Sequence, residues 1–213
     1  MTGFAVAHID EIDEVTDGRQ PLRPVRHHFG ITAFGITAWR AESAGDRVLN
    51  EHDEADDGSE ELYLVLQGRA VFELDGERVD ARAGTFVSVE PGVKRTAFAE
   101  EPGTTIVAVG GVPGKAYQPA GWEIWTPLRP LYEAGDYEAV VERGRAMIEA
   151  NPQYAEPMYN LACCEALAGR TDDAIEHLRQ AIDRYEQLRD FAKEDTDLDS
   201  LREEPAFKEL VGA

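Results

Sequence analysis

Hydrophobic positions follow two different patterns along the chain, and the change falls near Trp125. From Phe29 to Val109, short apolar runs alternate with polar residues and end at glycine-containing turns, which is typical of an all-β sandwich or barrel. After Trp125 the apolar residues recur with the period of amphipathic helices. We therefore expect two domains, the first all-β and the second all-α.

The strand-like runs are separated by residues that favour turns. Asp75-Gly76 predicts a tight hairpin turn, and Gly68 marks another break. The predicted strands read FGITAFGITAWRA, ELYLVLQ, RAVFELD, TFVSVE, RTAFAE and TTIVAVG.

In the C-terminal region, Gly135 and Gly169 lie 34 positions apart and each separates two helical segments. From Ala155 the chain reads AEPMYNLACCEALAGRTDDAIEHLRQAIDRYEQ, which resembles the tetratricopeptide repeat consensus. A pair of such helices cannot bury its apolar face alone, so we expect the tail to cap the stack. The expected capping residues are Leu198, Leu201, Phe207 and Leu210. The resemblance implies either a surface for a protein partner or packing on the rest of the chain.

The chain is strongly acidic, with 42 acidic and 21 basic residues and a formal charge of −21. This charge argues against nucleic acid and anionic membranes as partners, because no basic patch interrupts it. The N-terminus lacks the pattern of a targeting signal, and no run approaches the roughly 20 apolar residues that span a bilayer. We expect a cytoplasmic protein whose acidity provides solubility.

Three side chains of the helical region are expected to be structural. Cys163 and Cys164 are adjacent in a predicted helix, where their side chains point about 100° apart and do not form a relaxed disulfide. We interpret them as small residues of a helix interface. His177 is surrounded by charged residues, so we expect it to be exposed to solvent and assign it no role.

Two motifs in the strand region occur in order. Glu61 is followed by six residues and then Gly68, and the second motif reads GTFVSVEPG from Gly84 to Gly92. Together they resemble the two motifs of the cupin superfamily over roughly residues 29–112. The resemblance implies a small jelly-roll barrel.

The expected boundaries follow from the two resemblances. We expect an N-terminal segment at 1–28, a cupin-like β-barrel at 29–121, and a tetratricopeptide-like helical domain with its C-terminal cap at 122–213.

In metal-binding cupins the first motif supplies two histidines and a glutamate, and the second supplies a third histidine. Here His52 is the only histidine of the first motif, Glu54 takes the place of the second, and Glu61 matches the glutamate. In an extended segment Glu54 would project to the same side as His52. A residual site made of these three, with Asp56 or Asp57 reaching in, would favour manganese or magnesium over copper, with iron or zinc as further candidates.

Arg95 falls at the position of the third histidine. A guanidinium stays protonated and has no lone pair for a metal, so Arg95 cannot be a ligand. Three alternatives remain: an internal ion pair with Glu61 or Glu54, an anion-binding group for a carboxylate or phosphate, or a side chain turned to solvent. The predicted ligand-binding set is Arg95, Glu61 and Tyr63.

These observations favour a non-catalytic protein with a degenerate metal site and no cofactor, which binds a small ligand, such as an anion in the barrel, or a protein partner. The alternative is a metal-dependent enzyme of the dioxygenase or isomerase type, acting on a small polar substrate. No recognisable nucleophile motif supports covalent catalysis. A third hypothesis is a barrel that senses a small anion through Arg95 and signals to the helices. We also expect that an exposed edge strand can support a homodimer.

Overall fold

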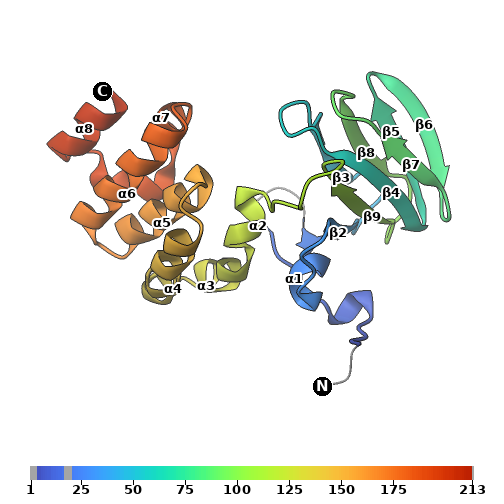
Figure 1. Cartoon of the computed structure of the whole chain (residues 1–213), viewed down its shortest axis with the longest axis horizontal. Coiled ribbons are helices and arrows are strands. Elements are labelled where there is room, and N and C mark those ends of the chain that lie inside the picture. The colour runs from blue at the N-terminus through green and yellow to red at the C-terminus, as the bar shows by residue number, and fades with distance from the viewer. Residues whose placement is uncertain (1–3, 17–20, 213) are drawn as a thin grey trace. The chain divides into compact units, whose positions relative to one another are not determined.

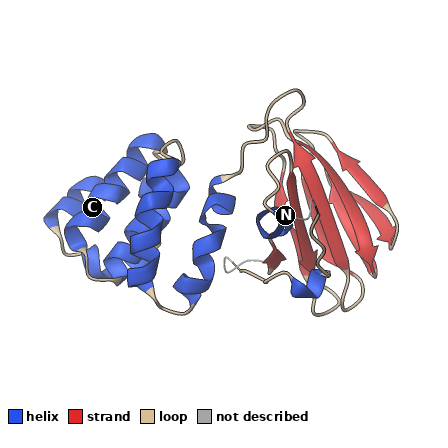
Figure 2. Cartoon of the chain, turned by 60° about the horizontal axis from the view of Figure 1, so that its bottom comes forward, coloured by secondary structure: helices blue, strands red, loops and turns tan. Residues whose placement is uncertain are grey.

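Figure 1 shows the structure, a computed structural model in which residues 4–16 and 21–212 are described. Its contacts divide the chain into two units, 1–118 and 119–213. Strands form the body of the first unit and helices form the second, as the colouring of Figure 2 shows. The predicted fold class is confirmed: an antiparallel β-barrel followed by an all-α region.

The first unit has two antiparallel sheets. One has the strand order β1-β2-β9-β4-β7 and the other β3-β8-β5-β6. A 3₁₀ helix, η1 (Ile9–Glu11), precedes β1, and a short helix, α1 (Val25–Phe29), precedes β2. The strands are β1 (Leu22–Arg23), β2 (Gly35–Arg40), β3 (Arg47–His52), β4 (Glu60–Gln67), β5 (Arg69–Leu74), β6 (Glu77–Arg82), β7 (Phe86–Val89), β8 (Arg95–Ala99) and β9 (Thr105–Gly111).

The core of this unit comes from one face of each strand, because successive side chains point to opposite faces. On β4, Tyr63 and Val65 are fully buried, whereas Leu62 and Leu66 are exposed. The same alternation buries Phe72 on β5 and Ile106 on β9. The inner faces of the two sheets therefore meet in one apolar core.

Two features of the strand unit differ from the prediction. The first half of FGITAFGITAWRA is not a strand, because α1 ends at Phe29 and Gly30, with φ of 66°, stops it in the left-handed conformation. Strand β3 was missed, since RVLNEH has little alternation and its pairing with β8 is interrupted by register shifts. The hairpin turn is confirmed, with Asp75 at φ 50° and Gly76 at φ 86°.

The second unit is a set of short helices. They are α2 (Gly121–Trp125), η2 (Thr126–Leu128), α3 (Arg129–Glu133), α4 (Tyr137–Ala150), α5 (Ala155–Leu167), α6 (Thr171–Arg184), α7 (Leu188–Glu194), η3 (Thr196–Leu201) and α8 (Pro205–Val211). Gly135 lies between α3 and α4, and Gly169 lies between α5 and α6, both with positive φ, as their predicted role requires.

The tail completes the helical core as predicted. Leu198, Leu201 and Phe207 are buried in the same cluster as the residues of α4, α5 and α6, and Leu210 packs against it. The cysteines are free and belong to this core, which confirms their assignment to a helix interface. None of the helices in the described part of the chain is both long enough and apolar enough to cross a membrane.

The prediction for His177 is wrong. Its side chain is only 18% exposed, and its Nδ1 lies 2.7 Å from Oε2 of Glu165, which is fully buried. Arg145 donates from Nε and Nη2 to the other oxygen of Glu165, at 3.1 and 2.8 Å. His177 lies three residues after Ala174 and four before Ala181, both buried, so it shares the inward face of α6 despite its charged neighbours.

Close packing of α4 on α5 gives a testable prediction. A Cβ at Gly144 would lie 3.0 Å from Cδ1 of Leu161 and 3.5 Å from Cδ1 of Leu128. We expect Gly144→Val to destabilise the helical unit by about 1–3 kcal/mol through overpacking. Ala146→Val, at an exposed position of the same helix, is the control for valine propensity. Urea unfolding measures both, and equal losses would contradict tight packing at Gly144.

Candidate functional site

The polar end of the barrel interior is built from two strands of opposite sheets. Glu61 lies on the inward face of β4, two residues before the buried Tyr63. Arg95 lies on the inward face of β8, two residues before the buried Ala97. Strand alternation thus places a carboxylate and a guanidinium inside a barrel whose other inward positions are mainly apolar.

Strand pairing surrounds these two groups. Glu61 is opposite Gly110 on β9 and Val89 on β7, and Arg95 is opposite His52 on β3. A Cβ at Gly110 would lie 3.2 Å from Cγ of Glu61, so the glycine leaves the room that the Glu61 side chain occupies. Gly110 and Gly111 both belong to strand β9, and Gly110 lines the site.

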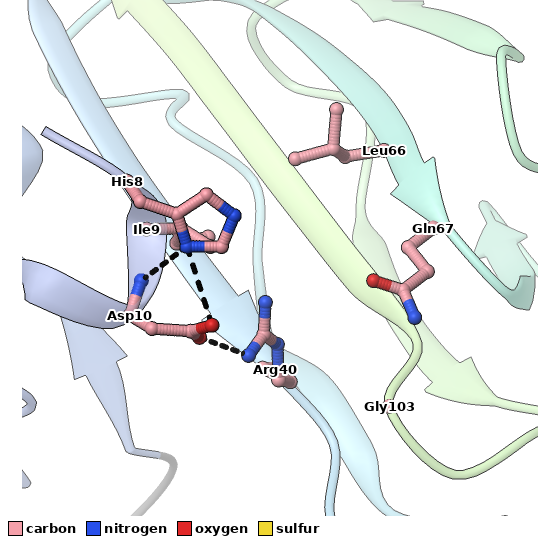
Figure 3. A pocket seen from close by; sticks show the side chains of 7 residues that line it. All are labelled: His8, Ile9, Asp10, Arg40, Leu66, Gln67 and Gly103. Atoms are coloured by element: carbon pink, nitrogen blue, oxygen red, sulfur yellow. Dashed lines mark hydrogen bonds and ion pairs between the residues drawn. The ribbon is translucent and has the colours of Figure 1, made fainter.

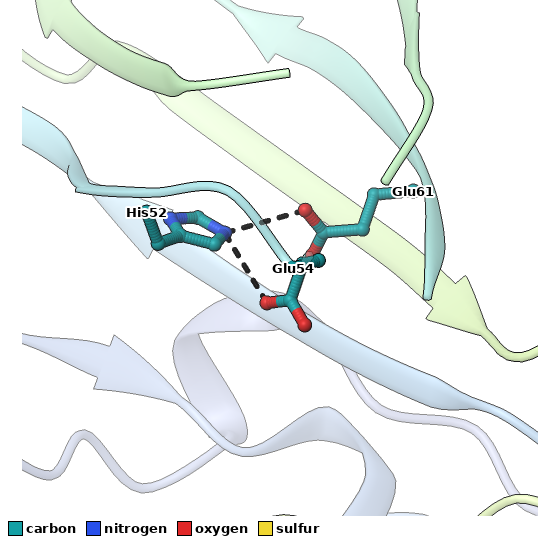
Figure 4. Close-up of side chains that lie close together, drawn as sticks. All are labelled: His52, Glu54 and Glu61. Carbon is teal, nitrogen blue, oxygen red and sulfur yellow. Dashed lines mark hydrogen bonds and ion pairs between the residues drawn. The ribbon is translucent and has the colours of Figure 1, made fainter. Parts of the chain in front are cut away.

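Three predicted metal ligands converge at this end of the barrel (Figure 4). Nε2 of His52 lies 3.3 Å from Oε2 of Glu61 and 3.6 Å from Oε1 of Glu54. One donor atom from each residue lies within 4.8 Å of the other two. The side chains of His52, Glu54 and Glu61 are 30, 23 and 16% exposed, so this end of the cluster is reached by solvent.

Oxygen Oε2 of Glu61 is the centre of the cluster. The Tyr63 hydroxyl donates a hydrogen bond to it, and Nε of Arg95 lies 3.3 Å away. His52 is oriented by its other nitrogen, since Nδ1 lies 2.8 Å from the carbonyl oxygen of Asn50 and donates to it. The Asn50 contact had no sequence signal, because a backbone carbonyl is available at any residue.

Arg95 is fully buried, so the alternative in which it turns to solvent is wrong. Among the residues that the structure describes, none offers a hydrogen-bond acceptor to Nε, Nη1 or Nη2, all three of which are shielded from solvent. The approach to Glu61 is an ion pair without hydrogen-bond geometry. Buried donors without acceptors are uncommon in folded proteins and need an explanation.

Glu54 reaches the cluster by a route the sequence did not indicate. Strand β3 ends at His52, and Glu54 adopts the left-handed conformation with φ of 54° rather than an extended one. Its carboxylate nevertheless turns towards His52. Asp56 and Asp57 are exposed in the following turn and do not belong to the cluster.

The two carboxyl groups have opposite pKa shifts. Burial raises the pKa of Glu54, and the nearby charge of Glu61 raises it further. Burial also acts to raise the pKa of Glu61, but hydrogen bonds from His52 and Tyr63 outweigh it and the pKa lies below its ordinary value. For His52, burial lowers the pKa, yet the contacts with Glu61 and Asn50 leave it raised overall.

Family models match both parts of the chain. A model described as a cupin domain matches residues 48–109, and one described as a tetratricopeptide repeat matches residues 131–195. The chain joins a cupin domain to a tetratricopeptide repeat region. No curated protein sequence matches it.

Several solved cupin structures are similar to this chain. A cupin protein from Bacteroides fragilis is 18% identical, with 56% of this chain and 93% of that chain covered and a TM-score of 0.43. KdgF from Halomonas sp. is 14% identical, with 55 and 96% covered and a TM-score of 0.41. A Streptomyces PAC13 variant with uridine is 20% identical, with 51 and 82% covered and a TM-score of 0.38.

The metal that metal-binding cupins hold does not fit the donor set found here. Oxygen Oε2 of Glu61 already faces a permanent guanidinium charge and accepts from the Tyr63 hydroxyl, and both contacts weaken this carboxylate as a metal ligand. Arg95 supplies the positive charge that a metal would supply to the carboxylates. His52 is then the only imidazole, without the three that make a cupin centre selective for transition metals.

A second cluster of possible ligands lies in the tetratricopeptide region, where Cys163, Asp195 and Asp197 approach one another. Its acceptors are already used, because the Tyr159 hydroxyl donates to Asp195 at 2.9 Å and the Tyr132 hydroxyl donates to Asp197 at 2.7 Å. Burial raises the pKa of the Cys163 thiol well above its ordinary value, which disfavours the thiolate that a metal needs. This cluster therefore holds η3 against α3 and α5.

Figure 3 shows a hollow on the outside of the barrel, near η1. Its one guanidinium, that of Arg40, pairs with Asp10 and also donates to the Thr105 hydroxyl at 3.1 Å. Arg40 therefore differs from Arg95, because side chains of the protein accept hydrogen bonds from its guanidinium. The hollow is lined by His8, Ile9, Asp10, Arg40, Leu66, Gln67 and Gly103.

Because the buried guanidinium of Arg95 lacks hydrogen-bond acceptors, we expect it to lower the free energy of unfolding of the cupin domain. Replacing a buried ion pair by neutral side chains is often neutral or stabilising by about 1–4 kcal/mol. We expect the double variant Arg95→Met/Glu61→Gln to be at least as stable as the wild-type protein, measured by calorimetric unfolding of the cupin domain. Arg82→Met, at an exposed position of β6, is the control. A double variant less stable than wild type by more than about 1 kcal/mol would show that the pair is a structural support.

Glu54 predicts a pH-dependent effect. Its folded-state pKa is raised above 4.5, so the charged carboxylate costs stability at higher pH and the cost disappears as pH falls below that value. Glu54→Gln should therefore raise the melting temperature near neutral pH and have little effect near pH 4. The neighbouring exposed Glu60→Gln is the control. A gain that is the same at both pH values would contradict the raised pKa.

Proposed function

We propose that the cupin domain is a metal-independent, non-catalytic binding site for a small ligand, and that the tetratricopeptide region contacts a protein partner. One observation carries the first part: Arg95 is fully buried beside Glu61, and its guanidinium nitrogens have no hydrogen-bond acceptor among the described residues. A ligand that supplies acceptors would satisfy these donors.

The electrostatics of the cluster support binding over proton transfer. Burial and the adjacent Glu61 raise the pKa of Tyr63, so its hydroxyl stays a neutral donor. The pKa of Glu61 is lowered, so it stays a carboxylate. General acid–base catalysis works best with groups whose pKa lies near the operating pH. Tyr63 and Glu61 are therefore suited to hold a ligand in position.

For the helical region, the repeat fold supports the proposal of a protein partner, because stacked helix pairs of this kind present extended surfaces. A homodimer through the barrel is a separate expectation. The outer face of its edge region exposes Leu62 and Leu66 on β4 and Phe86 on β7, and β7 ends its sheet. Exposed apolar edge regions favour association with another chain.

A metal-dependent enzyme of the dioxygenase or isomerase type is the second candidate. It is favoured by the convergence of His52, Glu54 and Glu61 within 4.8 Å. It is disfavoured by the guanidinium of Arg95, which lies 3.3 Å from Oε2 of Glu61 and would place a permanent positive charge beside the ion. We therefore favour the metal-free binding site over the metal-dependent enzyme as the function of the cupin domain.

Native mass spectrometry of protein purified without chelator tests the proposal. We expect wild-type protein to carry a small organic molecule, to lose it in Arg95→Met, and to keep it in the surface control Arg82→Met. Wild-type protein that instead carries one transition metal ion per chain, removable by chelator, would contradict the proposal and favour the enzyme. An organic adduct that survives in Arg95→Met would place the ligand elsewhere.

A further inference from the structure

The outer face of one sheet of the barrel carries a continuous apolar strip. Leu62, Leu64 and Leu66 alternate along β4, so their side chains share the face that points away from the barrel core. Strand pairing widens this row, because Leu64 is opposite Phe86 on β7 and Val107 on β9. Side chains that are directly opposite on neighbouring strands are in contact range. These five residues form the apolar strip.

The outer face of the other sheet has a different composition. There Arg69 pairs with Asp80 at 3.0 Å, and Glu73 is opposite Arg78. The apolar strip has no charged member, although the chain as a whole has a formal charge of −21. Two copies of so acidic a chain repel each other, and they can approach closely only where no carboxylates are brought together. The strip meets this condition for a second copy, and it offers no carboxylate to a basic partner.

A short N-terminal segment with two apolar side chains begins beside the strip. His8 and Ile9 line the same hollow as Leu66 on the outside of the barrel (Figure 3). Just before them in the sequence, Phe4 and Val6 are 75 and 87% exposed, more than any other large apolar residue that the structure describes. The structure thus leaves both side chains in solvent, next to an apolar surface that is also in solvent.

The exposed areas indicate that a stable interface needs both parts. Leu62, Leu66 and Phe86 are 42, 51 and 63% exposed, which amounts to about 300 Å² at roughly 200 Å² for a fully exposed large apolar residue. Phe4 and Val6 add about as much again by the same measure. Standard protein interfaces bury about 800 Å² on each partner. The strip alone falls far short of this area, whereas the strip and the N-terminal segment together come close to it.

We propose that a second copy of this chain covers the apolar strip in a two-fold symmetric dimer, with Phe4 and Val6 of each copy lying against the strip of the other. A two-fold interface uses the same surface on both copies, so the strip and the segment are each buried twice. The exposed Glu60 lies on the same face of β4, beyond Leu62, so the contact is centred at the Leu66 end. This inference specifies the homodimer expected above and does not depend on the ligand at Arg95.

A matched pair of variants tests the strip by sedimentation velocity. We expect wild-type protein at concentrations up to about 100 μM to sediment with twice the chain mass of 23.5 kDa. Phe86→Glu puts a carboxylate into the strip and should weaken dimerisation at least about tenfold. Phe191→Glu, at an equally exposed phenylalanine of α7, is the control and should leave the dimer unchanged. Monomeric wild-type protein, or equal dimerisation in the two variants, would overturn the inference.

The N-terminal segment is tested by Phe4→Ser/Val6→Ser. This double variant should also weaken dimerisation at least about tenfold. In the monomeric Phe86→Glu background it should not change urea unfolding, because both side chains are exposed within one copy. A loss of stability in that background would show that the segment packs on its own barrel, and unchanged dimerisation would show that it lies outside the interface. Either result would overturn the contact between copies.

Salt dependence gives an independent test. An apolar contact between two strongly acidic chains should become tighter as salt screens their repulsion, for instance from about 0.05 to 0.5 M sodium chloride. Dimerisation that instead weakens over this range would show that ion pairs hold the two copies together and would contradict an apolar interface.

This inference and the proposed binding function fail in different ways. A monomeric wild-type protein that carries an Arg95-dependent organic adduct would overturn the dimer and leave the binding function standing. A dimer that dissociates in Phe86→Glu but carries no adduct would support the interface and contradict the binding function.

Discussion

The buried guanidinium of Arg95 is the constraint on which the site depends. A permanent cation inside a barrel has to be compensated, and the ion pair with Glu61 supplies charge without hydrogen-bond geometry. Tyr63 and His52 hold Glu61 in that position from the other side. The four side chains therefore form one cluster, in which Arg95 stands where the resemblance to metal-binding cupins implies a histidine and its nitrogens have no acceptor among the described residues.

The alternation of the strands and one glycine position the side chains of this cluster. Strand alternation brings Glu61 and Arg95 to the same interior from opposite sheets, and Gly110 leaves space for the carboxylate. In the helical unit, buried Glu165 shows the contrasting solution, because Arg145 and His177 satisfy it with hydrogen bonds. The charge of Glu165 is satisfied within the protein, whereas the unpartnered nitrogens of Arg95 need an explanation.

The sequence predicted the fold class because the period of its apolar residues changes from two to about three and a half, and because Gly135 and Gly169 repeat at a fixed distance. It also predicted the grouping of His52, Glu54 and Glu61. It missed the left-handed turn at Glu54, since local backbone geometry was not visible in an acidic loop. It misplaced His177, because the charged residues beside it are neighbours in sequence while its helix face is buried.

The central claim is that Arg95 takes the place of a metal. The most direct measurement is the content of transition metals, in moles per mole of chain, for wild-type protein and Arg95→His after equilibration with manganese and zinc and removal of the excess. The account predicts far less than one equivalent in the wild-type protein and a marked gain in Arg95→His, where a second imidazole joins His52, Glu54 and Glu61. Wild-type protein with close to one equivalent of metal would contradict it.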